Sequence, residues 1–113
     1  MSTPASEKEE FKDRVQSWTE KLDAAVNSVA VRPMTNKWAS YSLKGRVTFD
    51  ASLLELRSEL QDYVIVHELL HSHVPNHGKL WKSLMRAHLG DYEALEEELQ
   101  RLETQKRQES QSL

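Results

Sequence analysis

The chain has 113 residues, of which 38% are hydrophobic and 29% charged, and its net charge is −3. These values describe one small soluble globular domain, residues 1–113, and argue against a dedicated nucleic-acid-binding protein. No apolar run is long enough to cross a membrane, and residues 1–10 are too polar for a signal peptide, so we expect a cytoplasmic protein. Cysteine is absent, which excludes disulfides and thiolate nucleophiles and leaves His, Asp or Glu to hold any metal.

The first expected element is a helix from about Ser6 to Val29. Its apolar residues recur every three or four positions and form one stripe, made of Phe11, Val15, Trp18, Leu22, Val26 and Val29. Ser6 and Glu9 have the spacing of a capping box, and Pro33 prevents any continuation of the helix. We expect this helix to pack on the core and to take no part in chemistry.

Residues 31–50 bring aromatic and β-branched side chains, with a turn at Lys44-Gly45. This pattern predicts a β-hairpin with strands at residues 37–43 and 46–49. Strands this short need a helix to cover one face. Residues 31–47 carry no acidic side chain, and their four basic residues are either a solvated face or a seat for an anionic substrate: Arg32, Lys37, Lys44 and Arg46.

From Ser52 onward the pattern is helical almost to the end of the chain. A short segment near residues 53–57 leads into a helix that carries the apolar and histidine positions from Tyr63 to His71. A second amphipathic helix covers residues 80–89 and ends at Gly90. A third begins near Tyr92 with glutamates on its outer face, and the polar tail after about residue 104 is expected to be flexible.

The most informative motif is His67-Glu68-Leu69-Leu70-His71, with His77 six residues further on. Residues four apart on a helix lie about 6 Å apart along its axis and on nearly the same side. His67 and His71 can therefore direct ring nitrogens at one ion. Glu68 is rotated by about 100° and reaches a water beside the ion instead. This is the HExxH pattern of zinc hydrolases.

A third ligand would leave one position of a zinc site open for water or substrate. On an unbroken helix His77 would lie about 15 Å from His67, so the helix must break between them. Pro75 disfavours helical geometry at Val74, and Asn76 is a good N-cap for a new helix with His77 in its first turn. The sequence therefore predicts a Zn²⁺ site made of three histidines.

The chain resembles the YgjP-like (WLM-type) zinc metallopeptidase domains of the zincin superfamily over about residues 31–95. The resemblance rests on residues 62–69, on residues 74–77 ending in Asn-His, and on residues 38–45, which are similar to the family's Trp-Gly-Ser-Cys-Ser segment. Ala39 and Tyr41 depart from that segment by replacing its Gly and Cys, which changes the chemistry of the cleft rim. The histidine spacing also matches the metzincins, but these place a glycine where this chain has Val74.

The resemblance implies an α+β fold, a minimal zincin-like domain with an N-terminal helix, a small antiparallel or mixed sheet, the HExxH helix and C-terminal helices. It implies His67, His71 and His77 as zinc ligands and Glu68 as the general base. In such a domain an extended polypeptide can add as a strand along the cleft. The residues expected to contact it are Trp38, Ser40 and Tyr41.

The activity expected from these features is zinc-dependent hydrolysis of polypeptide by a monomeric metallopeptidase. A nucleotide pyrophosphatase is one alternative, because the basic residues of the hairpin could hold phosphates. A non-catalytic zinc-binding module is another, with the acidic C-terminal helix contacting a partner protein. A protease recruited to DNA would require a more basic surface than this chain has.

Overall fold

The computed structural model describes residues 4–35 and 37–111, with the side chains of residues 7–35 and 37–106. The elements in chain order are α1 (Pro4–Leu22), β1 (Ser28–Arg32), β2 (Ala39–Tyr41), β3 (Arg46–Asp50), the 3-10 helix η1 (Ala51–Glu55), α2 (Ser58–Leu69), the 3-10 helix η2 (Leu70–Ser72), α3 (Lys79–Leu89) and α4 (Tyr92–Gln111). This is the α+β architecture expected of a minimal zincin-like domain. Within the described residues, no helix has the length and apolar character needed to cross a membrane.

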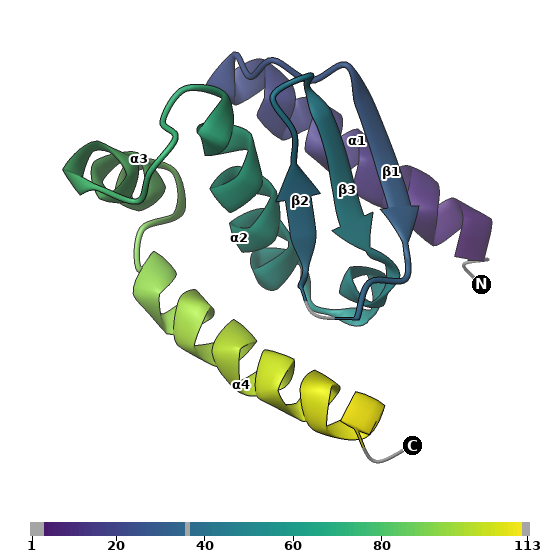
Figure 1. The fold of residues 1–113 in the computed structure, drawn as a ribbon. Coiled ribbons are helices and arrows are strands. Elements are labelled where there is room, and N and C mark those ends of the chain that lie inside the picture. The colour runs from purple at the N-terminus through teal and green to yellow at the C-terminus, as the bar shows by residue number, and fades with distance from the viewer. Residues whose placement is uncertain (1–3, 36, 112–113) are drawn as a thin grey trace.

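The sheet has the strand order β1-β3-β2 and is mixed. The predicted hairpin is confirmed, because β2 and β3 pair antiparallel with Ala39 opposite Phe49. β1 runs parallel to β3 on its other side, with Val31 opposite Phe49. β2 is therefore an edge strand, and Figure 1 shows it as the strand nearest to α2.

The expected extent of the first helix, Ser6 to Val29, is wrong at both ends. The helix begins at Pro4 and ends at Leu22, and Val29 belongs to β1. Asp23 has a φ of 51°, a left-handed conformation that ends a helix. The chain then joins the sheet, and the Asn27 N–H just before β1 donates a 2.7 Å hydrogen bond to the Gly45 carbonyl. Val26 and Val29 have the spacing of the helical stripe only by coincidence. Pairing with the sheet, and not the apolar spacing, therefore decides the structure of this segment.

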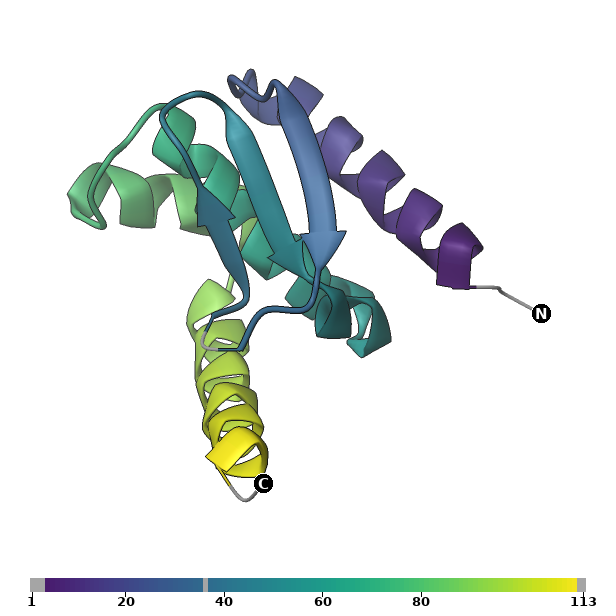
Figure 2. The ribbon, with the colours of Figure 1, turned by 45° about the vertical axis from the view of Figure 1, so that its right-hand side comes forward.

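Two helices, α1 and α2, pack against each other on one side of the sheet (Figures 1 and 2). The ring of Phe11 on α1 meets that of Phe49 on β3 edge to face, with centroids 5.1 Å apart. α2 buries Ile65, Val66 and Leu69 completely. A helix enclosed to this extent is a rigid support, and it carries His67 and Glu68 of the HExxH motif, while His71 follows in η2.

α4 packs beside α2, and its C-terminal end extends away from the rest of the domain (Figure 2). Lys106 ties this helix to the sheet, because its ammonium donates to the Asp50 carboxylate and also lies over the Trp38 ring. Burial opposes the ionisation of Asp50, but hydrogen bonds from Lys106, the Ser52 hydroxyl and the Met34 N–H outweigh it and lower the pKa of the carboxyl. Where the sequence indicated a tail from about residue 104, the helix continues to Gln111.

Candidate metal centre

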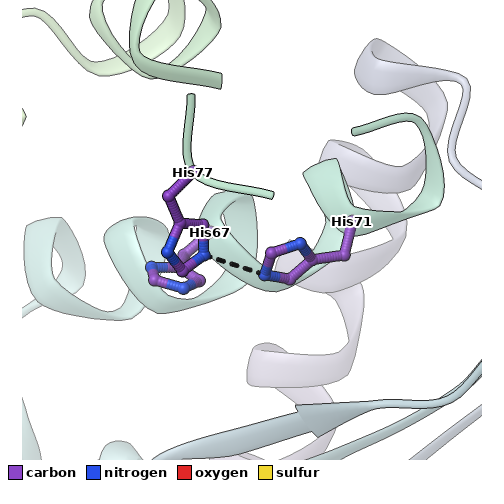
Figure 3. Close-up of side chains that lie close together, drawn as sticks. All are labelled: His67, His71 and His77. Atoms are coloured by element: carbon purple, nitrogen blue, oxygen red, sulfur yellow. Dashed lines mark hydrogen bonds between the residues drawn. The ribbon is translucent and has the colours of Figure 1, made fainter. Parts of the chain in front are cut away.

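Three histidine rings converge at the end of α2. His67 lies in the last turn of α2, His71 in η2, and His77 in the loop before α3. Each ring offers one nitrogen, and these three atoms all lie within 4.8 Å of one another. Figure 3 shows the rings facing one another, with the Nε2 atoms of His71 and His77 3.1 Å apart. Nitrogens bound at about 2.0–2.1 Å to one tetrahedral ion are about 3.4 Å apart, so this donor set fits a zinc ion.

A hydrogen bond sets the tautomer of His71. Its Nδ1 lies 3.1 Å from the carbonyl oxygen of Val74. A carbonyl can only accept, so Nδ1 carries the proton and Nε2 keeps its lone pair facing the other two rings. The neutral ring nitrogen is the form that binds a metal. The Val74 carbonyl thus both orients the ring and prepares the atom that can act as ligand.

The loop that brings His77 back differs in detail from the expected helix break. Gly78 is the N-cap of α3, and the helix begins at Lys79, so His77 lies before the helix and not in its first turn. Asn76 is not the N-cap of α3, and its side-chain oxygen accepts a 3.3 Å hydrogen bond from the Gly78 N–H within the loop. The tight turn made by this contact, together with Pro75, still returns His77 to the end of α2.

His67 is enclosed by aromatic rings. Trp81 lies 5.0 Å from it and Tyr63 5.7 Å, measured between ring centroids. Burial is the main reason why the pKa of His67 falls to about 4, and the neighbouring His77 and His71 lower it further. Burial and His71 also lower the pKa of His77, although Glu96 opposes this. Both rings are therefore neutral at physiological pH and available to a cation.

Glu68 faces a cleft beside the histidines. The cleft has a volume of about 250 Å³ and is bounded by α2, by the start of β2 and by α4. Burial raises the pKa of the Glu68 carboxyl, while electrostatic interactions with the His71 ring and the Lys37 ammonium act in the opposite direction. A carboxylate with a raised pKa is a better proton acceptor, which is the property required of a general base near neutral pH.

The three residues expected to contact substrate lie in different places. Trp38 lines the cleft, next to His67 and Glu68. Ser40 and Tyr41 follow on β2 but do not line the cleft, and the Tyr41 hydroxyl donates a 2.8 Å hydrogen bond to the Ala25 carbonyl. The cleft instead includes Tyr63 and several side chains of α4, which were not among the predicted site residues.

Comparison with known proteins identifies the family. The model of the YgjP-like metallopeptidase domain matches residues 4–102, which is most of the chain. The chain belongs to the YgjP-like metallopeptidase family. The family is one of metallopeptidases, and the protein is a zinc metallohydrolase, as the motif predicted.

A solved structure supports the same assignment for this YgjP-like domain. The chain is similar to the metallopeptidase zymogen of Methanocaldococcus jannaschii jannalysin, with 29% sequence identity and a TM-score of 0.69. The match covers 83% of this chain and 95% of that one. No curated protein matches the chain significantly.

Proposed function

We propose that this YgjP-like domain hydrolyses peptide bonds in extended polypeptide, with His67, His71 and His77 as zinc ligands and Glu68 as general base. The observation that carries the proposal is the convergence of three ring nitrogens within 4.8 Å, beside a carboxylate that lines a cleft. Three protein ligands leave one position of a four-coordinate zinc site for water or substrate, which is the arrangement of catalytic sites. His67, His71 and His77 would hold a zinc ion, which would lower the pKa of a bound water and polarise the peptide carbonyl.

Glu68 moves the proton. Its carboxylate takes a proton from the attacking water as the water oxygen bonds to the peptide carbon, and it then delivers that proton to the leaving nitrogen. Burial of Glu68 favours the protonated form that this shuttle passes through, since it raises the pKa of the carboxyl. The surrounding rings of Trp81 and Tyr63 hold His67 in place and keep bulk water away from it.

The edge of the sheet supports a polypeptide substrate. β2 is an edge strand and its start lines the cleft, so its outer N–H and C=O groups can pair with an extended peptide. We propose Trp38 as a side-chain contact on the cleft wall. Ser40 and Tyr41 would contribute through the β2 backbone, since the Tyr41 hydroxyl already binds Ala25.

The positions of the basic residues disfavour nucleotide phosphates as the substrate. Arg46 starts β3 and pairs with Ser28, whereas Arg32 pairs with Asp50 at the other end of the same strand. These ends are about 13 Å apart for a strand of this length. Of the four basic residues, only Lys37 lines the cleft. They therefore do not form a single phosphate-binding cluster at the metal centre.

The experiment that tests the proposal separates metal binding from turnover. Zinc-loaded wild-type protein should cleave unfolded polypeptide, and Glu68→Gln should bind zinc equally well but lose turnover by a factor of about 10² or more. Glu55→Gln, an exposed position on η1, is the matched control and should keep full activity. Zinc content is measured by atomic spectroscopy and cleavage by fluorescence. If Glu68→Gln cleaved polypeptide at the wild-type rate, Glu68 would not be the general base.

The ligand assignment is tested by metal stoichiometry. His77→Ala should lower zinc affinity by at least about 10-fold, because it removes one of three protein ligands. His88→Ala is the control, since His88 packs on Trp18 away from the three rings. Unchanged zinc binding in His77→Ala would show that the third ligand is a different group.

A further inference from the structure

The cleft beside Glu68 has the size of a pocket for one side chain. Its volume of about 250 Å³ is below the range of about 300–1,000 Å³ typical of small-molecule sites. Its walls are partly apolar, with the Trp38 ring on one side and Val64 and Leu99 on the others. Such walls suit the methylene stem of a long substrate side chain or the apolar part of a chain terminus.

The charged lining of this pocket is predominantly negative. Glu96 and Glu103 enter it from α4 and Glu68 from α2, and the only cation among its lining residues is Lys37. Lys37 is exposed at the rim, and its positive charge acts on Glu68. The nearby Lys106 ammonium is bound to Asp50 and lies over the face of Trp38, and it is not among the residues that line the pocket.

Glu96 is the carboxylate of this set that is available to a ligand. It is half-buried and makes no hydrogen bond or salt bridge to any residue in the described part of the chain. The negative charge of Glu96 acts on Tyr63 and on His77, which lie at or near the three histidine rings. Burial is the main reason why the pKa of Tyr63 is raised, and the negative charge of Glu96 adds to that effect. Glu96 also acts electrostatically on His77.

We propose that Glu96 is a specificity-determining residue, and that the pocket it lines receives a positively charged nitrogen group of the substrate. This inference rests on the proposed peptidase function and names the substrate preference of the same site. Two sources carry the required chemistry: the ammonium or guanidinium of a Lys or Arg side chain, and the free amino terminus of a peptide. Either would form a charge-assisted hydrogen bond with the Glu96 carboxylate while its apolar part packs on Trp38 and Leu99.

The two sources are distinguished with a peptide series. Unfolded N-acetylated peptides carry Lys, norleucine or Glu in turn at each position flanking the cleaved bond, and matched norleucine peptides are made with a free amino terminus. At one position the Lys peptide should exceed the norleucine peptide by about tenfold in kcat/KM, with the Glu peptide lowest. A gain seen only when the acetyl group is removed assigns the pocket to the amino terminus. No gain in either series overturns the proposal.

The role of Glu96 is tested on the ratio of kcat/KM for the cationic peptide to kcat/KM for the norleucine peptide, and not on activity itself. Glu96→Gln should reduce the cation-to-norleucine ratio of kcat/KM to near one, and Glu96→Lys should invert it in favour of the Glu peptide. Glu97→Gln, exposed on the next position of α4, is the matched control and should keep the wild-type ratio. A ratio that is unchanged in Glu96→Gln would remove the assignment.

A binding measurement separates this inference from the proposed function. In a Glu68→Gln background, fluorescence anisotropy gives the Kd of each peptide without turnover. The preferred cationic peptide should bind about tenfold more tightly than the norleucine peptide, and adding Glu96→Gln should abolish that difference. If wild-type protein cleaves no peptide but this preference is found, the peptidase proposal fails and the cationic pocket stands. Equal binding of all peptides overturns the pocket whatever the activity.

Discussion

Metal-free protein should lose stability as the pH falls below about 6.5, because His67 is buried in its neutral form. Its pKa is lowered from 6.5 to about 4 on folding, so the unfolded chain takes up the proton first. The stabilising contribution is fully present above the unfolded pKa, and its loss grows as the pH falls toward the folded value. At about 1.4 kcal/mol per pKa unit, the loss between about pH 7.5 and about pH 5 is about 2 kcal/mol. That is a large share of the roughly 5–15 kcal/mol typical of a domain.

The assay is urea unfolding of chelator-treated protein at both pH values, with His67→Asn as the reference variant. The reference is needed because Glu68 acts in the opposite direction. Its raised pKa gives a contribution that is fully present below the unfolded pKa and is lost as the pH rises through the folded pKa. The stability difference between wild type and His67→Asn should shift by about 2 kcal/mol in favour of the variant at the lower pH. A difference that stays constant within about 0.5 kcal/mol would refute the reasoning.

Three further perturbations test the site and its supports. Zinc at about 100 times its Kd should raise the free energy of unfolding by about 2.7 kcal/mol, seen as a higher Tm that a chelator reverses; an unchanged Tm would count against the metal centre. Lys106→Met removes the ammonium that pairs with the Asp50 carboxylate, which is 2% exposed. The free energy of unfolding measured in urea should fall by about 3 kcal/mol, and a fall below about 1 kcal/mol would show that this ion pair does not hold α4. Gly45→Ala should cost about 1–3 kcal/mol, because Gly45 has a φ of 78° and a Cβ would lie 3.0 Å from the Asn27 side chain; full stability would show that the turn can relax.

The histidine cluster could be predicted from the sequence because every element of it is local. The spacing of His67 and His71 on a helix and the break at Pro75 together bring three rings to one place without any knowledge of the rest of the fold. The details of the break could not be predicted in the same way. Asn76 and Gly78 are both acceptable N-caps, and the choice between them depends on the hydrogen bond that forms within the loop.

The parts of the fold that depend on distant pairing were harder to predict. β1 lies in a stretch whose valines continue a helical stripe, and only its pairing with β3 makes it a strand. In the cleft, Tyr63 could have been suspected, since it stands one helical turn before His67 on the same side of α2. Glu96 could not, because its place in the cleft depends on how α4 packs against α2. In the sequence it is one of several glutamates on an amphipathic helix.

The short span of the histidine cluster also bears on how the protein folds. All three rings come from residues 67–77, so the loop that must close around an ion is short and its entropy cost is small. The parallel pairing of Ser28 with Arg46 closes a somewhat longer loop. An ion bound by the three rings would therefore order residues 67–77 at a small entropy cost, so that metal binding and the folding of this segment are coupled.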